Sequence, residues 1–494
     1  MIIAHDLGTT GNKATLVDDT GRLRAAVTVA YGTEFGPGGK AEQDATAWWR
    51  AVAEATRRLL ERVPGAAQRV DVVSFSGQMM GAVFLDEKAE PVRPAIIWAD
   101  TRSTRQTQQL IDRIGMERAY RILGHRLNPT YSLEKVMWVR DNEPDSFRRT
   151  RHIVCAKDYA AYRLTGRLHT DPSDASSTNA YDQSAGTWSE EILAAAGIPA
   201  TLLAEIVPSQ TVIGAVTPEA AAETGLRSGT AVVIGGGDGP MAALGAGIVG
   251  PDSGAYTYLG SSSWVSRAAD EPLLDPQMRS MTFNHVVPGR FVPTATMQAG
   301  GASLQWIVEV LQPEAQDYDA LLAEAAEVEA ARDGLYFLPH LLGERSPYWN
   351  PLARAVFAGL ARHHDRRHLV RAVLEGVAFN LNTGLLAVAA GGAPIDSIRA
   401  IGGGAGSDLF LQVLSDVWGR PVRRRALAEE ATALGAAIVG GVGVGLFDDY
   451  GIAASLSDDT GSFEPDADGH RSYARAYELF MDAYRRLEPW FERL

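Results

Sequence analysis

The stretch IIAHDLGTTGNKATLVDD, residues 2–19, returns in altered form as AYTYLGSSSWVSRAA, residues 255–269. When Gly8 is aligned with Gly260, the two copies lie about half a chain length apart. Each copy predicts a strand, a tight turn at glycine and a second strand. The repeat therefore predicts two similar α/β domains, each of which contributes one hairpin.

Both turns have the composition of a phosphate-binding loop. Glycine lets the backbone approach closely, and consecutive N–H groups converge on an anion. The hydroxyls of Thr9, Thr10, Ser261 and Ser262 add further donors. One such turn is also an ordinary hairpin turn, but two indicate domains that face each other across a nucleotide. This arrangement resembles the actin, Hsp70 and hexokinase superfamily.

Composition and charge fit a two-domain enzyme that acts on small molecules. A chain of 494 residues makes two or three domains. The net charge of −14 disfavours nucleic acid and anionic membranes as partners. The N-terminus lacks a signal-peptide pattern, and no apolar run predicts a membrane span, so we expect a cytoplasmic protein. The sequence leaves open whether it forms a homodimer.

The single cysteine, Cys155, excludes an internal disulfide and a cysteine-based metal cluster. Its apolar neighbours Ile153 and Val154 predict a buried, inert thiol.

The remaining pattern is mixed α/β. In the first half the pattern predicts three successive strands at residues 1–7, 13–18 and 23–31, then one helix at 45–62 and a buried strand at 70–77. The second half predicts helices at 368–390 and 431–441, the latter close-packed because it is rich in Gly and Ala. Glycines at 235–247 place the boundary between an N-terminal domain, 1–245, and a C-terminal domain, 246–494.

Three further motifs extend the resemblance to one family. They are AVFAGLARHHDRRHLVRAVLEG at 355–376, TYSLEKVMWVRDN at 130–142 and GLYFLPHLLGERSPYWNP at 334–351. Together with the hairpins they resemble the FGGY carbohydrate kinases from end to end. The resemblance implies two ribonuclease H-like domains around a central cleft. The N-terminal domain would hold the sugar and the first loop, and the C-terminal domain the second loop and the adenosine of ATP.

Two aspartates are the candidate catalytic residues. Asp238 follows an apolar strand and three glycines, so it is displayed at a strand end without bulky neighbours. In the resembling kinases the matching Asp takes the proton from the acceptor hydroxyl; a helix N-cap is the alternative. Asp6 ends the first strand beside the first loop, where it suits Mg²⁺ held through water or merely caps the turn. The resemblance implies a metal site at Asp6 and Asp238.

The remaining ATP-binding candidates lie in three segments. Gly8 and Gly260 lie within the two loops, and Lys13 either reaches a phosphate or points to solvent. The segment IGGGAGSD, residues 401–408, leaves room for a flat adenosine beside a helix N-terminus. The matching family positions here are Gly403, Gly404, Ala405 and Asp408.

The acceptor candidates lie in SFSGQMMGAVFLDE, residues 74–87, and RPAIIWADTRS, residues 93–103. Five of them match xylulose kinases: Gln78, Met79, Trp98, Asp100 and Arg102. Met80 stands where those relatives usually have His, and Gly239 stands where they often carry Asn after the base. Both changes remove polar groups that bind sugar hydroxyls.

We therefore expect D-xylulose as the first candidate acceptor. Gluconate is the second, because WADTRS and HLLGERSPYWNP also resemble gluconate kinases. A non-catalytic sensor of sugar or nucleotide is the alternative from another class, but retention of Asp6 and Asp238 argues against it.

Overall fold

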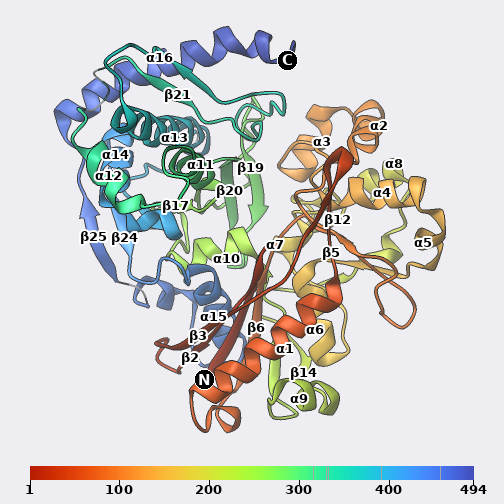
Figure 1. The fold of residues 1–494 in the computed structure, drawn as a ribbon. Coiled ribbons are helices and arrows are strands. Elements are labelled where there is room, and N and C mark those ends of the chain that lie inside the picture. The colour runs from red at the N-terminus through yellow and green to blue at the C-terminus, as the bar shows by residue number, and fades with distance from the viewer. Residues whose placement is uncertain (315, 330, 332, 391, 457) are drawn as a thin grey trace.

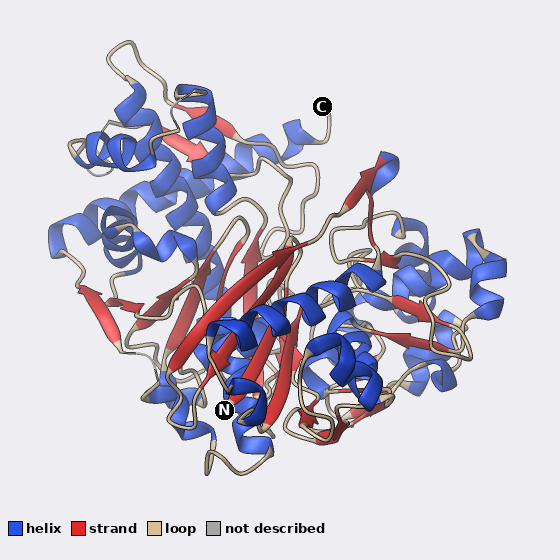
Figure 2. Ribbon diagram, turned by 60° about the horizontal axis from the view of Figure 1, so that its bottom comes forward, coloured by secondary structure: helices blue, strands red, loops and turns tan. Residues whose placement is uncertain are grey.

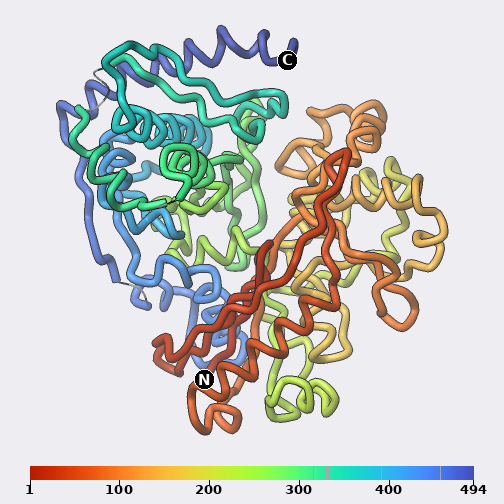
Figure 3. Tube along the Cα trace, viewed as in Figure 1, coloured from red at the N-terminus to blue at the C-terminus, as the bar shows by residue number. Residues whose placement is uncertain are grey.

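Two seven-stranded sheets form the two halves of the computed structural model (Figure 1). It describes residues 1–314, 316–329, 331, 333–390, 392–456 and 458–494. Figure 2 shows the strands gathered in the middle of the molecule with helices around them. The two termini lie at opposite ends (Figure 3).

The first sheet has the strand order β14-β15-β6-β1-β2-β3, and β16 also pairs with β6. Its strands are β1 (Ile2–Leu7), β2 (Gly11–Val17), β3 (Leu23–Ala30), β6 (Val72–Gly77), β14 (Val212–Ala215), β15 (Ala231–Val233) and β16 (Gly236–Gly237). The second sheet has the order β19-β20-β18-β17-β23-β24-β25. Its strands are β17 (Ala255–Leu259), β18 (Ser263–Arg267), β19 (Met281–Asn284), β20 (Phe291–Met297), β23 (Ile398–Ile401), β24 (Val422–Arg425) and β25 (Asp459–Phe463).

The two sheets share one topology. In the first, β2 is antiparallel to β1 and β3, whereas β6 runs parallel to β1 and β15 parallel to β6. In the second, β18 is antiparallel to β17 and β20, and β23 and β24 continue in parallel. The β1–β2 and β17–β18 hairpins therefore occupy equivalent places. The prediction of two ribonuclease H-like domains is confirmed.

Helices cover both sheets. α1 (Ala45–Arg62) begins where Asp44 accepts a hydrogen bond from the Thr46 N–H at 2.9 Å, and it buries Trp48, Val52 and Leu59. The helices α2 (Thr104–Ile114), α3 (Met116–Leu123) and α4 (Ser132–Asn142) share a separate apolar cluster that includes Leu110, Leu123 and Val136. The other helices used below are α6 (Ala156–Thr165), α7 (Pro172–Ala175), α10 (Asp238–Gly245), α11 (Gly301–Leu311), α12 (Tyr318–Ala326), α13 (Arg366–Ala389), α14 (Asp408–Trp418), α15 (Ala431–Gly443) and α16 (Ala467–Phe491).

The predicted close-packed helix is α15, and it joins the halves. A Cβ atom on Gly245 would lie 1.7 Å from the Ala431 carbonyl oxygen, and one on Gly435 would lie 2.1 Å from that of Met241. Only glycine lets α10 and α15 approach so closely. α15 also packs on the first sheet, where Leu434 shares an apolar cluster with Ile2. In Figure 3 its blue trace returns to the red N-terminal strands.

Helix α13 is long and apolar enough to cross a membrane by length and composition alone. However, 83% of its apolar window is buried inside the protein, which identifies it as a core helix of the second half.

Candidate active site

A cavity of about 450 Å³ opens between the two hairpin turns. Thr9 and Thr10 line it from the first turn, Ser261 and Ser262 from the second, and Asp238 from the start of α10. Elements far apart in the sequence thus place hydroxyl donors and a carboxylate in one space. This arrangement suits a reaction at a phosphate group.

The Asp238 carboxylate is displayed by a glycine-rich strand end. β16 adds to the end of β6, and a Cβ on Gly237 would lie 2.6 Å from the Met79 Cγ, so this chain path requires glycine. Gly237 holds the N-cap position of α10, and Asp238 is the first helical residue. Asp238 Oδ1 accepts a hydrogen bond from the Gly239 N–H at 2.8 Å.

The Asp6 carboxylate is not among the residues that line this cavity, but it lies near enough to repel Asp238, and its Oδ1 accepts a hydrogen bond from Ser76 Oγ at 3.0 Å. Burial, reinforced by the Asp6 charge, raises the pKa of Asp238 to about 7. Burial also raises the pKa of Asp6 to about 6, although the Ser76 hydroxyl and the Lys13 charge oppose the shift. A divalent cation between them would offset this repulsion, and carboxylate oxygens are ligands that Mg²⁺ prefers. The donor set therefore fits the implied metal.

We expect the activity to depend on pH through Asp238. A base must be deprotonated to accept a proton, and a pKa of about 7 leaves Asp238 protonated in acid. Because bound Mg²⁺ lowers the pKa of Asp238 from its metal-free value, the kcat/KM for the acceptor should fall about tenfold per pH unit below a break at or under roughly pH 7, and level off above it. Initial rates measured from about pH 5.5 to 8.5 test this, and a flat profile would contradict the assignment.

The first turn is held by its neighbours. Asp6 and Lys13 are cross-strand partners in the β1–β2 hairpin, and Lys13 Nζ donates to the Glu429 carbonyl at 2.9 Å. Lys13 thus reaches across to the second half. The Tyr31 hydroxyl donates to the Gly8 carbonyl, and Trp98 Nε1 donates to Thr9 Oγ1 at 2.9 Å.

A second cavity, of about 560 Å³, adjoins Leu259 at the end of β17. Of the predicted adenosine-site residues, Gly403, Gly404 and Asp408 line it, whereas Ala405 is buried beneath. A Cβ on Gly404 would lie 2.9 Å from the Leu259 Cβ, so glycine keeps this wall thin. The size and the flat glycine wall suit a nucleoside.

The exposed Asp408 carboxylate pairs with Arg424, whose Nε also donates to the Ala405 carbonyl at 2.7 Å. The opposite wall includes Leu304 of α11 and Tyr318 of α12, which the sequence analysis missed. These helices carry ordinary amphipathic patterns, and nothing in their sequence signals a ligand.

The predicted acceptor residues divide into two groups. Met79, Met80, Trp98 and Gly239 line the 450 Å³ cavity with Asp238. Gln78 lies behind it, where its Nε2 donates to Gln43 Oε1 at 2.8 Å.

Asp100 and Arg102 are not among the residues that line this cavity. Arg102 Nε donates to Asp100 Oδ2 at 2.8 Å, and its Nη2 donates to Glu42 at 2.5 Å. The guanidinium also lies 4.3 Å from the centre of the Trp138 ring. These contacts brace the chain that carries Trp98.

Arg345 is a site residue that the sequence analysis did not single out. It lies in the predicted family block at 334–351 and lines the cavity beside Met80 and Met281. Its Nη2 lies 3.6 Å from the Met80 sulfur and 3.7 Å from the Met281 sulfur. Among the described residues, its Nε has no hydrogen-bond partner. The lining of the cavity thus includes one cationic side chain, whose buried Nε faces away from solvent and whose other polar neighbours include Tyr131.

Comparisons with known proteins agree with this geometry. Residues 1–245 match the N-terminal domain of the FGGY family of carbohydrate kinases, and residues 255–444 match its C-terminal domain. The chain is 32% identical to the xylulose kinase of Escherichia coli over 99% of both chains. It is 30% identical to the gluconokinase of Bacillus subtilis, over 100% of this chain and 97% of that relative.

A solved structure of ligand-bound xylulose kinase from Lactobacillus acidophilus superposes with a TM-score of 0.94 at 25% identity. The superposition covers 100% of this chain and 99% of that one.

Proposed function

The chain belongs to the FGGY family of carbohydrate kinases, and we propose that it transfers the γ-phosphoryl group of ATP to D-xylulose, giving D-xylulose 5-phosphate. As a member of this family it is a sugar kinase that uses ATP, so the non-catalytic sensor is set aside. The observation that carries the proposal is the position of Asp238, which shares one cavity with both hydroxyl-bearing turns and with the acceptor wall.

Each part of the site has one role in the proposed reaction. The adenosine lies in the 560 Å³ cavity, and the two turns donate N–H and hydroxyl groups to the phosphates. Asp238 takes the proton from the attacking hydroxyl. Asp6 and Asp238 would hold Mg²⁺, which would supply positive charge to neutralise the phosphates. We also propose that residues 1–245 and 246–494 form the two domains and that the protein lies in the cytoplasm. A homodimer is the assembly that we propose to test.

D-xylulose is the first choice because several of the relatives described as xylulose kinases match nearly the whole chain. The acceptor wall offers Trp98 and two methionines to the carbon chain of the sugar.

Gluconate is a second candidate acceptor, and Arg345 favours it. A guanidinium binds a carboxylate through two parallel hydrogen bonds. Arg345 lines the acceptor cavity, where its Nη2 has the sulfurs of Met80 and Met281 as neighbours.

The test is acceptor-dependent ADP release, measured with D-xylulose, gluconate, other ketopentoses, pentitols, tetruloses and glycerol. We expect the highest kcat/KM with D-xylulose. A higher value with gluconate would assign the anionic acceptor instead. If both are inert while another polyol reacts, the D-xylulose proposal is wrong.

Residue 80 should tune this choice. Met80 lines the cavity with a left-handed backbone (φ 64°), a conformation that His tolerates better than most residues. We expect Met80→His to raise kcat/KM for D-xylulose relative to other acceptors by up to about tenfold, or roughly 1.4 kcal/mol for one added hydrogen bond. Met80→Leu, which conserves volume without a polar group, is the control. An equal change for all acceptors would show that residue 80 does not select the sugar.

A further inference from the structure

A fully buried ionic cluster lies beneath the loop that carries Asp238. Lys157, in the first turn of α6, has an ammonium group 2.6 Å from Asp158, 3.1 Å from Asp171 and 3.3 Å from Asp174. All four side chains have no exposed surface. Burying four charged groups is costly, and such a cluster often adds little to stability.

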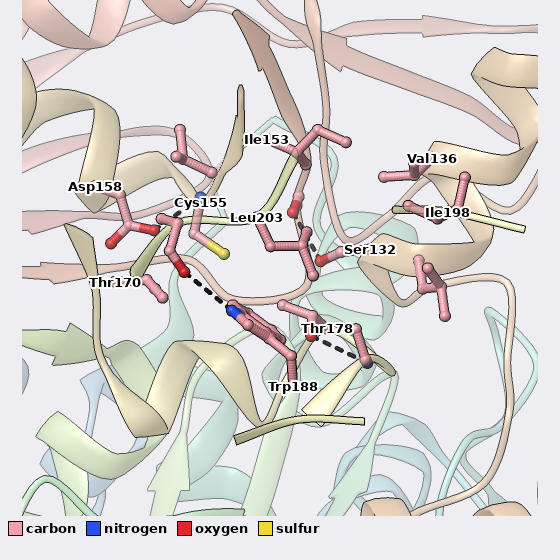
Figure 4. A pocket seen from close by; sticks show the side chains of 15 residues that line it. Ser132, Val136, Ile153, Cys155, Asp158, Thr170, Thr178, Trp188, Ile198 and Leu203 are labelled. Atoms are coloured by element: carbon pink, nitrogen blue, oxygen red, sulfur yellow. Dashed lines mark hydrogen bonds between the residues drawn. The ribbon is translucent and has the colours of Figure 1, made fainter. Parts of the chain in front are cut away.

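The cluster is not a vacant metal site. Cys155, Asp158 and Asp174 have ligand atoms within 4.8 Å of one another. Figure 4 shows Cys155 and Asp158 on one side of a cavity of about 20 Å³, with Val136 and Ile198 on the opposite side. The Lys157 ammonium already compensates the two carboxylates, and burial raises the pKa of the Cys155 thiol, which disfavours the thiolate that binds metal.

One aspartate of the cluster is linked directly to the catalytic loop. Asp171 Oδ2 accepts hydrogen bonds from Ser173 Oγ at 2.6 Å and from Ser209 Oγ at 2.7 Å. Ser173 Oγ in turn accepts the N–H of Gly237 at 2.8 Å. Gly237 directly precedes Asp238, so the chain of contacts runs from an ammonium group to the backbone of the proposed base.

The geometry of β16 makes this link necessary. β16 has two residues and, among the described strands, pairs only with β6; the Ser173 side chain supplies the acceptor for the buried Gly237 N–H. A Cβ on Gly236 would lie 2.7 Å from Ser173 Oγ and 3.2 Å from Asp171 Oδ2. Glycine therefore lets the strand lie directly against the Ser173–Asp171 pair.

The same short segment contacts two other parts of the site. Ser177 Oγ accepts the N–H of Met80, and Ser176 Oγ accepts the N–H of Asn284 in β19 of the second half, at 3.2 and 3.0 Å. The segment after Asp171 thus supports the base loop, the acceptor wall and the opposite domain.

We infer that Ser173, held by Asp171 and Lys157, is a positioning residue that fixes the direction in which Asp238 faces the acceptor hydroxyl. The inference rests on the proposed function, since it needs Asp238 as the base. Its hydroxyl donates to a carboxylate and accepts from the backbone, and the charge-assisted bond to Asp171 orients it. A base that is misplaced by a fraction of an ångström loses rate without losing ligand affinity.

The chain offers a matched pair of variants. Ser173→Ala and Ser209→Ala each remove one hydroxyl bond to Asp171 Oδ2, but only Ser173 contacts Gly237. We expect Ser173→Ala to lower kcat by about 10- to 100-fold while the KM values for acceptor and ATP change less than about twofold. Ser209→Ala should keep kcat within about twofold. Ser173→Ala should lower the melting temperature more than Ser209→Ala, because it loses two buried hydrogen bonds, to Asp171 and from the Gly237 N–H, whereas Ser209→Ala loses one.

Equal kcat values for the two variants would overturn the inference, and so would a loss by Ser173→Ala that appears only in KM. If Ser173→Ala does not fold, Ser173→Cys, which keeps the volume but accepts a hydrogen bond weakly, must show the same loss confined to kcat. The Asp238→Asn variant distinguishes a failure of the proposed function from a failure of the positioning role of Ser173. Near-normal turnover by Asp238→Asn refutes Asp238 as the base. If Asp238→Asn is inactive but Ser173→Ala and Ser209→Ala have equal kcat values, only the positioning role of Ser173 is refuted.

Discussion

Replacing Asp238 by Asn is expected to reduce acceptor-dependent turnover by about 10² to 10⁴, the contribution of a general base. Asn has the shape of Asp and keeps an oxygen for the Gly239 N–H, so the fold and ATP binding should persist. What it loses is the capacity to accept the proton from the hydroxyl. Steady-state kinetics with the purified variant, together with nucleotide binding measured by calorimetry, separate these two properties.

Asp252→Asn is the matched control for this variant. Asp252 lies in the short turn after α10 and is exposed, so kcat should stay within about twofold of the original enzyme. A comparable loss in both variants, or near-normal kcat for Asp238→Asn under conditions in which chemistry limits the rate, would remove Asp238 from the role of base.

Replacing Gly245 by Ala is expected to destabilise the protein by about 1–3 kcal/mol, the usual cost of overpacking. Helix propensity alone favours Ala over Gly by up to about 1 kcal/mol, so the packing effect must reverse the sign. The added Cβ would lie 1.7 Å from the Ala431 carbonyl oxygen, and α10 and α15 must separate to admit it. Because α10 begins at Asp238, turnover should fall as well.

Thermal unfolding monitored by circular dichroism measures this effect. Gly250→Ala serves as the control, since an added Cβ there meets no described atom within 4 Å. An unchanged melting temperature for Gly245→Ala would mean that the contact between α10 and α15 is looser than the structure shows.

The fold could be predicted from the sequence because its main signals are local. The two glycine hairpins, the apolar strands before them and the helix at Ala45–Arg62 depend on residue types at short spacing. The same applies to Asp238, whose display needs only a strand followed by small residues. The buried Cys155 was also predicted correctly and is confirmed.

Other parts of the site depend on tertiary contacts that short motifs do not encode. Tyr318 reaches the 560 Å³ cavity only because α12 lies beside the Gly403–Gly404 turn in its lining. Ser173 meets Gly237 across 64 positions of sequence. The family resemblance predicted Asp100 and Arg102 as acceptor-binding residues. In the structure Arg102 donates hydrogen bonds to the carboxylates of Asp100 and Glu42. Their direct contact with sugar stays a prediction.

The most direct test of the account is the identity of the phosphorylated product. The enzyme would be incubated with ATP, Mg²⁺ and D-xylulose, and the mixture analysed by ³¹P NMR and mass spectrometry. The account predicts equal amounts of ADP and a sugar monophosphate, with little inorganic phosphate. ADP that appears with inorganic phosphate and without a phosphorylated sugar, for D-xylulose, gluconate and every other acceptor tested, would contradict it.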